Sequence, residues 1–448
     1  MSSGWCTSTG FPSGWTGCST RTPGSSRGRI SSSTTTGTSW RSTGATACAS
    51  TGRWTRRTGN SRRRSSGWPS WATCRLRGMR GLFLQPFDGG SHRAFLSGLL
   101  ANTRADWEVL ALPAGGWRRR MRRGAEELAR QFERVRGAFD VVVATDMVDL
   151  AEFLALTRRR LGGTPAMVYF HENQVTYPRL RGTKFNSWFG QINYRSALAA
   201  DAAAFNSEFH RADLLGAFRQ LEREPNNWLT AEGIAAIAAK SLVLPVGVEL
   251  DWLEGPEERG EPRTLLWNHR WEFDKAPELF ERAVRRLAEE GVPFQLIIAG
   301  EPGENPSPAM WRIRETLADR LLHFGFAASR EEYARLLRMA DIAVSTTRHE
   351  FFGIGMVEAM AAGCIPCAPR RYAYPELVPA EHHDLLWEDE AGLMARLRAL
   401  LTGPLPPREP FRAAARRFGW ERVGPMWQEA LEALAAGAVP GSAALRLR

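Results

Sequence analysis

Residues 341–367 have the sequence DIAVSTTRHEFFGIGMVEAMAAGCIPC, which contains the clearest structural pattern in the chain. An apolar run at Asp341–Ser345 predicts a buried β-strand, and Cys364–Cys367 predicts another. Between them, Gly353 and Gly355 predict a turn that opens a helix of small residues. A strand, a helix and a second strand in this order are typical of a parallel sheet covered by helices.

The same alternation continues outward and starts again in the second half of the chain. Other strands are predicted at 81–84, 107–112, 140–144, 166–170, 264–268 and 294–300. An amphipathic helix is predicted at 280–290, closed by Gly291, because glycine favours helix C-termini. The two patterns join near residues 245–247. We therefore expect an α/β protein with two Rossmann-like domains, 79–245 and 246–448, whose parallel sheets face a cleft and of which the second ends in a terminal helix.

Charge is unevenly distributed along the chain. The formal charge is +11, but residues 1–78 contain 12 Arg and no Lys, Asp or Glu, so the remainder has 47 basic and 48 acidic side chains. Ser, Thr and Gly fill 44 of these 78 positions, a composition that cannot bury a core. We expect 1–78 to be a non-native or disordered leader, with Met79 as the native start. The alternative is a basic arm that contacts nucleic acid.

Cysteine and hydropathy patterns exclude two classes of protein. Six cysteines in 448 residues exclude a disulfide scaffold, and no apolar run is long enough to predict a membrane span. Cys364 and Cys367 have the spacing of a redox or metal motif, but no second Cys or His pair completes a zinc site. We expect both to be small core residues.

Two carboxylates flank the glycine-containing turn at 353–355. Gly353 lets the backbone approach a ligand closely, and the N–H groups at the helix start, near Ile354, suit a phosphate. Glu358 lies about one turn into the helix and can accept hydrogen bonds from ribose or sugar hydroxyls. Glu350 precedes the turn. The structural alternative is a strand–turn–helix in which a Glu favours the helix dipole.

These features resemble the retaining glycosyltransferases of family 4, whose signature is two Glu separated by seven residues, a helix of small residues, a Gly and a strand. A second family element is an Arg and a Lys after the first strand of the C-terminal domain, matched here by Arg270 and Lys275. Two such cations can clamp a nucleotide diphosphate and stabilise charge on the leaving group. The alternative is that Arg270 and Lys275 are exposed side chains on a loop with no role in binding. The segment 323–341 resembles the family region that frames the nucleotide base.

The first half is similar to the tRNA-queuosine alpha-mannosyltransferases. The similar segments are DGGSH (88–92), LPAGGW (112–117), FHENQVTYP (170–178), and 186–191 with 205–207. The resemblance extends over essentially all of 79–448. It implies transfer of mannose from GDP-mannose to a cyclopentenediol hydroxyl of queuosine in tRNA, with retention of the α configuration. It also implies a cytoplasmic enzyme with tRNA and a nucleotide sugar as partners and no stable protein partner.

Taken with the residue patterns, this resemblance assigns roles to particular side chains. The residues expected to be catalytic are His171, Arg270, Lys275 and Glu350. The residues expected to bind the donor are Gly89, Gly90, Phe326, Gly353, Ile354 and Glu358. The residues expected to bind the acceptor are His92, Glu172, Asn173, Arg118, Arg119 and Arg122. A tight turn at the glycines and a structural role for the histidines are the alternatives.

No metal is expected in the reaction. The sequence after residue 78 contains no Asp-x-Asp pair, and the two cations of the second half can supply the positive charge. Front-face transfer, in which the leaving phosphate takes the acceptor proton, is favoured over double displacement. The reason is that the resemblance places Glu350 against sugar hydroxyls, and a double displacement needs a nucleophilic carboxylate at the anomeric carbon.

An arginine-rich segment, WRRRMRR at 117–123, is a candidate tRNA surface. Arg contacts phosphates and stacks on bases, and 158–160 and 370–371 could extend the surface. A solvated helix face is the alternative. The nearly neutral charge after residue 78 argues against tight binding of RNA irrespective of its sequence.

Two other functions stay open at this point. One is a family 4 glycosyltransferase that acts on a lipid, a glycan or a small molecule, since a basic surface also suits an anionic membrane. The other is a non-catalytic nucleotide-sugar or RNA-binding protein. The presence of all four motif side chains argues against it, namely Arg270, Lys275, Glu350 and Glu358.

Overall fold

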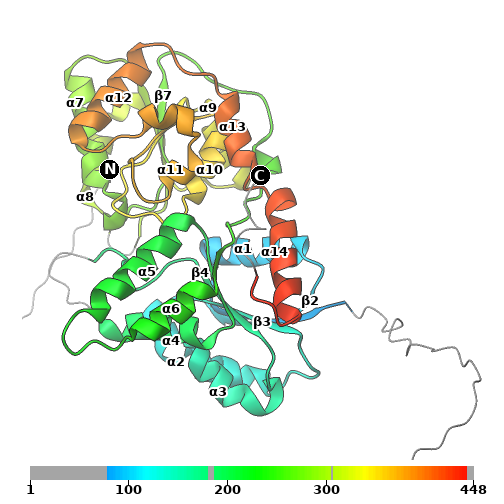
Figure 1. The fold of residues 1–448 in the computed structure, drawn as a ribbon. Helices are drawn as coiled ribbons and strands as arrows, with labels where there is room; N and C mark the ends of the chain where they lie inside the picture. The colour runs from blue at the N-terminus through cyan, green and yellow to red at the C-terminus, as the bar shows by residue number, and fades with distance from the viewer. Residues whose placement is uncertain (1–77, 180–185, 304–305, 441–448) are drawn as a thin grey trace, which may run out of the picture. The chain divides into compact units, whose positions relative to one another are not determined.

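The structure is a computed structural model that describes residues 78–179, 186–303 and 306–440 (Figure 1). Within these residues the chain forms two parallel β-sheets, one in each half. The expectation of a leader concerns residues that lie outside the described ranges, apart from Gly78.

Among the described residues, the first half contains a six-stranded sheet in the order β2-β1-β3-β4-β5-β6. Its strands are β1 (Arg80–Asp88), β2 (Asp106–Pro113), β3 (Val141–Thr145), β4 (Ala166–Phe170), β5 (Ala202–Phe205) and β6 (Ser241–Val243). Its helices are α1 (Gly90–Asn102), α2 (Trp117–Phe132), α3 (Leu150–Leu161), α4 (Ser187–Ala199), α5 (Glu208–Glu222) and α6 (Ala231–Ala239).

Both faces of this sheet are buried. In β1, Leu82 and Leu84 belong to one apolar cluster, and Phe83 between them belongs to another. Successive side chains of a strand point to opposite faces, so an unbroken apolar run is what a sheet covered on both sides requires. This explains why continuous apolar runs predict the strands of the first half.

The second half contains, within the described ranges, a five-stranded sheet in the order β11-β10-β7-β8-β9. Its strands are β7 (Thr264–Trp267), β8 (Gln295–Ala299), β9 (Leu321–Gly325), β10 (Ile342–Val344) and β11 (Ile365–Cys367). Its helices are α7 (Pro277–Glu289), α8 (Pro308–Thr316), α9 (Arg330–Met339), α10 (Ile354–Ala361), α11 (Tyr374–Leu377), α12 (Glu390–Thr402), α13 (Glu409–Arg416) and α14 (Trp420–Ala435). Short 3-10 turns are η1 (Asp251–Leu253), η2 (Phe273–Lys275), η3 (Ala318–Arg320) and η4 (Ala380–Leu385).

The order of strands reverses once in each sheet. β1 pairs with both β2 and β3, and β7 pairs with both β8 and β10, all in parallel. At such a reversal the connecting helices leave on opposite faces, and a crevice opens at the carboxyl ends of the strands. The predicted α/β fold with two Rossmann-like sheets is confirmed, and these two reversals mark where a ligand is expected.

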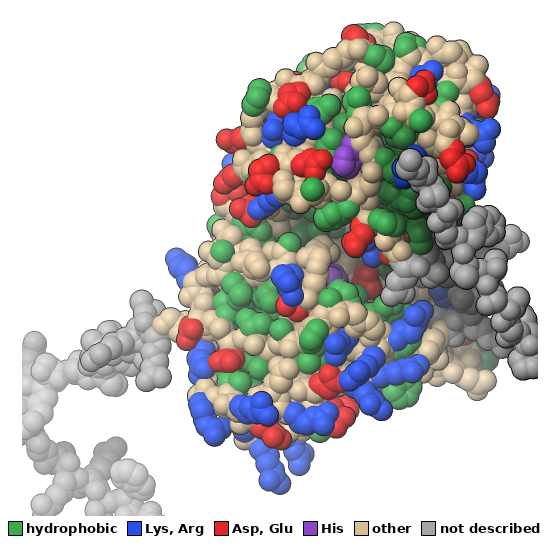
Figure 2. Space-filling model, turned by 180° about the vertical axis from the view of Figure 1, so that it is seen from behind, with side chains coloured by type: hydrophobic (Ala, Val, Ile, Leu, Met, Phe, Trp, Pro, Cys, Tyr) green, Lys and Arg blue, Asp and Glu red, His purple; other side chains and the backbone are tan. Residues whose placement is uncertain are grey.

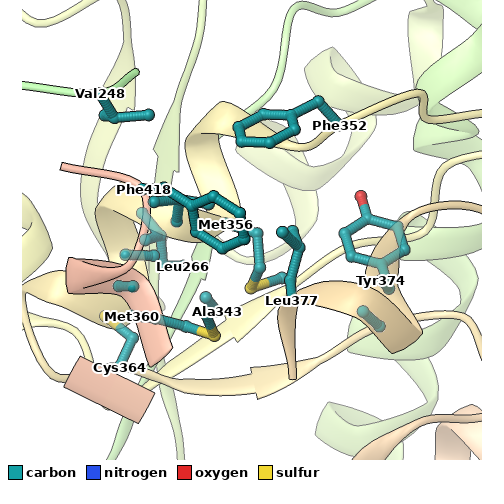
Figure 3. Packing of buried hydrophobic residues seen from close by; sticks show 14 of the residues in the cluster. Val248, Leu266, Ala343, Phe352, Met356, Met360, Cys364, Tyr374, Leu377 and Phe418 are labelled. Carbon is teal, nitrogen blue, oxygen red and sulfur yellow. The ribbon is translucent and has the colours of Figure 1, made fainter. Parts of the chain in front are cut away.

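Helix α10 is anchored by an apolar core beneath it. Figure 3 shows Met356 and Met360 of this helix packed near Ala343 and Leu377. Cys364 is fully buried in the same core, and both cysteines after residue 78 are free. The prediction that they are core residues is confirmed, and the helix start is held rigidly against the sheet.

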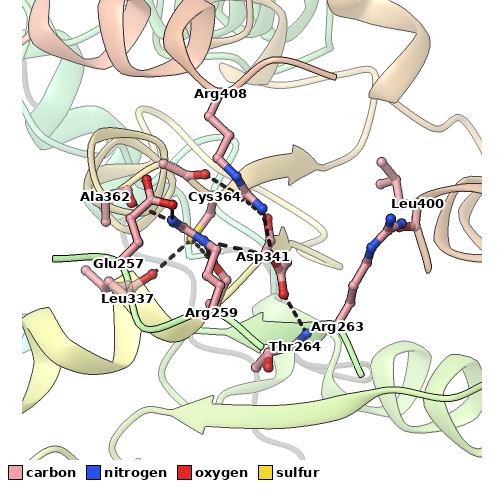
Figure 4. A network of polar contacts seen from close by, with 12 residues as sticks. Glu257, Arg259, Arg263, Thr264, Leu337, Asp341, Ala362, Cys364, Leu400 and Arg408 are labelled. Atoms are coloured by element: carbon pink, nitrogen blue, oxygen red, sulfur yellow. Dashed lines mark hydrogen bonds and ion pairs between the residues drawn. The ribbon is translucent and has the colours of Figure 1, made fainter. Parts of the chain in front are cut away.

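A network of buried charges lies at the amino edge of the second sheet (Figure 4). Asp341 accepts a hydrogen bond from the backbone N–H of Thr264 at 3.0 Å and pairs with Arg408 at 2.7 Å. Arg259 donates to the carbonyl of Ala340 and pairs with Glu257. The network joins the chain before β7, the chain before β10 and helix α13.

The last helix, α14, packs against α1 of the first half (Figure 1). Trp427 is fully buried, and its ring centroid lies 5.4 Å from that of Phe95 and 4.8 Å from that of Tyr169. The ring of Trp420 fills the space where Gly98 and Gly247 lack a Cβ. The end of the chain therefore completes the core of the first half. A search of the described helices for one long and apolar enough to cross a bilayer gives none.

Candidate active site

Lys275, Asp274 and Glu350 form a charge cluster at the carboxyl edge of the second sheet. Lys275 belongs to η2, after β7, and Glu350 to the loop between β10 and α10. The Lys275 Nζ lies 3.0 Å from Glu350 Oε2 and 3.3 Å from Asp274 Oδ2. The structure therefore brings together two of the residues predicted to be catalytic, at the point where the strand order reverses.

The cluster keeps both predicted residues charged. Burial raises the pKa of Glu350, but Lys275, His269 and the Phe352 amide act more strongly, so the pKa is lowered overall. Burial lowers the pKa of Lys275, but Glu350 and Asp274 outweigh it and raise the pKa. A lysine held in its charged form inside a cavity can stabilise a developing phosphate charge.

Arg270 is the exposed cation beside this cluster. Its guanidinium lies 3.1 Å from Glu272, and the side chain is 57% exposed. Its neighbour His269 is buried, and burial, helped by Lys275, lowers the pKa of His269 to about 4. Arg270 can therefore turn toward a ligand, whereas His269 stays neutral beneath the cluster.

Glu358 is held by a short chain of hydrogen bonds. Tyr333 Oη donates to Glu358 Oε2 at 3.2 Å and accepts from Asn268 Nδ2 at 3.0 Å. Burial raises the pKa of Glu358 to about 7. A buried carboxylate of this kind gains from a ligand that donates hydrogen bonds, as vicinal hydroxyls do.

The turn before α10 depends on its glycines. Gly353 has a φ of 100°, a left-handed conformation that other residues rarely adopt, and it is the N-cap of the helix. A Cβ on Gly355 would lie 3.0 Å from Asn268 Nδ2. Ile354 is the first helical residue, and the first N–H groups of a helix have no partner within it. The turn thus presents backbone donors, as the sequence predicted.

In the first half, His171 lies directly after β4, and its ring centroid is 4.5 Å from that of His92. The backbone N–H of His171 donates to Asp146 Oδ1 at 3.0 Å. Burial, followed by the charge of Arg270, lowers the pKa of His92 to about 4, and burial also lowers the pKa of His171 well below its usual value. Both imidazoles are neutral, and one buried nitrogen of each has no hydrogen-bond partner in the described part of the chain.

Glu172 and Asn173 have different surroundings. Burial raises the pKa of Glu172 to about 7, and Arg270 acts in the opposite direction. Its Oε1 accepts from Gln174 Nε2 at 2.8 Å. Asn173 is fully buried, and its amide oxygen accepts from the N–H groups of Val175 and Thr176. Glu172 is thus close enough to the second half to contact a ligand, whereas Asn173 shapes the loop.

Three other predicted donor residues lie apart from the charge cluster. Gly89 is extended, and a Cβ there would meet Ala114 at 2.6 Å, whereas Gly90 has a φ of 51° at the start of α1. Phe326 follows β9 and is 72% exposed. The glycines make the close turn after β1, and the phenylalanine offers a ring to solvent.

The predicted RNA-binding arginines lie on the outer face of α2. Arg119 pairs with Glu127, Arg118 lies over Trp117, and Arg122 lies over Phe189. On the face seen in Figure 2, Lys and Arg side chains gather over the first half of the chain. These arginines are exposed, and no contact between them and the charge cluster occurs among the described residues.

Hydrogen bonds join site residues of the first half of the chain to those of the second half. Tyr177 Oη donates to Asp274 Oδ2 at 3.5 Å, and Ser207 Oγ donates to the carbonyl of Phe351 at 2.6 Å. Glu376 accepts from the N–H groups of Glu208 and Phe209 at the start of α5. These bonds place the loops after β4 and β5 against the loop before α10.

Several polar residues of the site were not predicted from the sequence. They are Asp146, Asn268, His269, Asp274 and Tyr333. Most of them follow a buried strand directly, which is the available sequence signal, since polar residues at the carboxyl ends of parallel strands meet at one edge. Tyr333 lies on a helix and carried no such signal.

A cavity of about 720 Å³ lies beside Glu358. It is lined by residues of α1 between Ser91 and Asn102, by the segment from Val246 to Trp252, and by residues of α9, α10 and the start of α14. The volume falls in the range of ligand sites. Within the described residues, no group of three or more His, Cys, Asp or Glu side chains is arranged to hold a metal ion.

Comparison with known sequences identifies the family. The model described as tRNA-queuosine alpha-mannosyltransferase N-terminal matches residues 80–248, and the model described as Glycosyl transferases group 1 matches 250–418. A tRNA-queuosine alpha-mannosyltransferase of Drosophila melanogaster is 35% identical over 67% of this chain and 82% of its own length. This chain belongs to the tRNA-queuosine alpha-mannosyltransferase family. It is therefore a glycosyltransferase, as the sequence motifs predicted.

More distant relatives widen this comparison. A GDP-mannose-dependent alpha-(1-6)-phosphatidylinositol dimannoside mannosyltransferase of Mycobacterium tuberculosis is 27% identical over 44% of this chain and 54% of its own length. The solved sucrose-phosphate synthase of Thermosynechococcus elongatus superposes with a TM-score of 0.62 at 17% identity, over 81% of this chain and all of that one. At that identity the likeness concerns the fold. It confirms the predicted arrangement of two Rossmann-like domains with parallel sheets, which in glycosyltransferases is called the GT-B fold.

Proposed function

We propose that this chain transfers mannose from GDP-mannose to the queuosine nucleoside of tRNA and forms an alpha-mannoside. The observation that supports this most is the 35% identity to the Drosophila tRNA-queuosine alpha-mannosyltransferase. The first half also matches the N-terminal model of that family, and the second half matches the model of group 1 glycosyltransferases. The Mycobacterium relative, whose name states dependence on GDP-mannose, supports the choice of donor.

The donor diphosphate would lie between Arg270, Lys275 and the start of α10. Lys275 is held charged by two carboxylates, and Arg270 is free to swing from Glu272 to a phosphate oxygen. As the glycosidic C–O bond breaks, negative charge grows on the β-phosphate, and preorganised cations stabilise it. In this proposal the two side chains do this without a metal ion.

Retention follows most simply from front-face transfer. Glu350 is tied to Lys275 at 3.0 Å, so its carboxylate is engaged by a cation and suits the binding of sugar hydroxyls better than attack on the anomeric carbon. The acceptor hydroxyl adds to the anomeric carbon on the face that the phosphate leaves, and its proton passes to the departing phosphate oxygen. Trapping of a covalent mannosyl-enzyme in the wild type and not in Glu350→Ala would refute this.

The acceptor nucleoside would approach from the first half. Arg270 acts on the pKa values of His92 and Glu172, and Asp274 and Lys275 also act on that of Glu172, so these two side chains lie within electrostatic range of the second half. His171 lies against His92. Neutral imidazoles with an unpaired nitrogen can bind sugar or cyclopentene hydroxyls. The exposed arginines of α2 would contact the tRNA backbone at a greater distance from the reaction.

The deciding experiment uses protein that begins at Met79, with full-length protein in parallel. It is mixed with GDP-[14C]mannose and with two tRNA pools, one with queuosine and one without it. Label in the queuosine pool alone would support donor and acceptor together. Label in neither pool, with slow hydrolysis of GDP-mannose, would favour a lipid, glycan or small-molecule acceptor. Absence of turnover with every sugar nucleotide would favour a binding protein.

A further inference from the structure

A connected group of side chains lines one wall of the cavity beside Glu358. Tyr333, which donates to Glu358, stacks on Trp252 with ring centroids 5.8 Å apart and an angle of 26° between the planes. The Arg330 guanidinium lies 4.6 Å from the centroid of the Trp252 ring. Trp252 Nε1 donates to the backbone carbonyl of Glu249 at 2.7 Å. All five residues line the same cavity.

Arg330 and Glu249 form a pair at the outer end of this group. Arg330 Nη2 lies 3.2 Å from Glu249 Oε2, and the two side chains are 49% and 63% exposed. A salt bridge this exposed adds little to stability. Trp252 contacts the guanidinium of Arg330 through its ring and the backbone carbonyl of Glu249 through its N–H. The ion pair thus places a donor group and an acceptor group side by side in the lining of the cavity.

Arg330 lies at the start of α9, directly after the loop that follows β9. This is the carboxyl edge of the sheet, the same edge that bears Glu358 and the start of α10. Arg330 also acts on Glu358 electrostatically, since it opposes the effect of burial on the pKa of Glu358. A nucleoside whose ribose contacts Glu358 would thus extend its base toward Arg330 and Glu249.

We propose that Glu249 and Arg330 select guanine as the base of the donor nucleotide. This inference rests on the proposed function only for the identity of the donor as a guanosine diphosphate sugar. Along one edge guanine presents an acceptor, O6, then a donor, N1–H, then a second donor, the N2 amino group. Arg330 offers only donors and matches O6, and the carboxylate of Glu249 offers only acceptors and matches both N–H groups.

Other bases do not match this pair. Uracil has a carbonyl oxygen, O2, where guanine has the amino group, so the second oxygen of Glu249 would meet a lone pair. Adenine has a donor where guanine has O6, so it would meet Arg330. A site that hydrogen-bonds one base strongly rejects an analogue that leaves its polar groups unpaired.

The test measures equilibrium binding of free GDP, UDP and ADP by calorimetry, with no acceptor present. The wild type is expected to bind GDP at least about tenfold more tightly than UDP or ADP. In Glu249→Gln an amide N–H₂ can replace one carboxylate oxygen. This variant is expected to lose most of the preference for GDP over UDP. Arg330→Gln is expected to lower the affinity for GDP by about tenfold or more.

Glu254→Gln is the matched control, because Glu254 is an exposed carboxylate of the same segment that does not line the cavity. Thermal melting of each variant checks the fold. An unchanged ratio of GDP to UDP affinity in Glu249→Gln, or a wild type that prefers UDP, would overturn the inference. This binding test is independent of the tRNA assay. If the protein selects GDP through Glu249 but does not mannosylate queuosine, the proposed function is refuted and the assignment of Glu249 and Arg330 stands.

Discussion

The two edges of the second sheet bury charged groups in opposite ways. At the amino edge, Asp341 contacts two arginines and a backbone N–H, so its charge is fully compensated. At the carboxyl edge, the charges of Lys275 and Glu350 are also paired. There, however, several buried polar atoms have no hydrogen-bond partner among the residues that the structure describes, including His269 Nε2, Asp274 Oδ1 and His349 Nε2. At the amino edge Arg259 Nη1 also lacks a hydrogen bond within the described residues, but it pairs with the carboxylate of Glu257. Unpartnered buried atoms cost free energy, so this edge is arranged for a ligand and the other for stability.

A substitution at the amino edge is expected to have the largest effect on stability. Asp341→Asn keeps an oxygen for the Thr264 N–H but leaves Arg408 without its counter-charge, whereas Arg259 still pairs with Glu257. The free energy of unfolding is expected to fall by about 3–5 kcal/mol, because an uncompensated buried charge remains. Turnover of the folded protein should not change. Urea unfolding, with exposed Asp319→Asn as the control, measures the difference, and equal stability of the two variants would contradict the prediction.

A substitution at the carboxyl edge is expected to lower the rate of catalysis and to leave stability almost unchanged. Arg270→Ala is expected to raise the barrier to mannosyl transfer by about 2–4 kcal/mol, because the leaving group no longer has one of its preorganised cations. Its stability should stay within about 0.5 kcal/mol of the wild type, since the side chain is exposed. Arg282→Ala on α7, also an exposed arginine paired with a glutamate, serves as the control. If the Arg270→Ala variant reacts at a rate near that of the wild type, the proposal that Arg270 stabilises the leaving phosphate is wrong.

A pH titration sharpens the same contrast. The pKa of Glu358 is raised by burial to about 7, so the folded protein binds this proton more tightly than the unfolded chain does. Stability must then fall as pH rises between the unfolded value and about 7. Glu358→Gln is expected to match the wild type near pH 4 and to exceed it above pH 7 by at most about 3 kcal/mol.

Chemical unfolding of both proteins without nucleotide, repeated across this pH range, gives the difference directly. A difference that does not vary with pH would contradict the assigned burial of the carboxylate. Glu350 is the internal comparison, because Lys275 holds its pKa below the usual value, so no such gain is expected from removing its charge at neutral pH.

The smallest effect is expected on the outer face of α2. Replacement of Arg118 and Arg122 by Ala should weaken tRNA binding. The slope of log K against log salt should fall by about one for each phosphate that the protein no longer neutralises. Removal of Arg285 and Arg286 from α7 takes away the same charge elsewhere and is the control. Equal slopes for the two double variants would exclude α2 from the tRNA surface.

Much of this fold could be predicted from the sequence. Strands with unbroken apolar runs, such as 140–144 and 166–170, were predicted within a residue of β3 and β4, because sheets covered on both faces require such runs. Strand β5, Ala202–Phe205, was not recognised as one, since three alanines have no strand preference and are placed there by pairing with β4 and β6. Helix α7 begins earlier than predicted, at Pro277, where proline favours the first turn.

The site was less predictable than the fold. Glu350 and Glu358 were predicted from the glycine-containing turn and the resemblance to the glycosyltransferase family, and Arg270 and Lys275 from that resemblance. The hydrogen bond of Tyr177 to Asp274 links the two halves, and no local pattern predicts a contact made only in the folded chain. The same holds for Trp252, whose ring contacts the guanidinium of Arg330, a residue 78 positions later in the chain.

The packing of α14 on α1 has a consequence for biosynthesis. Gln428 accepts a hydrogen bond from the backbone N–H of Arg104, a residue 324 positions earlier, and Trp427 fills space between Phe95 and Tyr169. Domains generally fold in the order in which the ribosome produces them. Here the first half of the chain lacks part of its core until α14 leaves the ribosome. A nascent chain that stops before Trp420 would expose the apolar side of α1, and we expect chaperones to retain it.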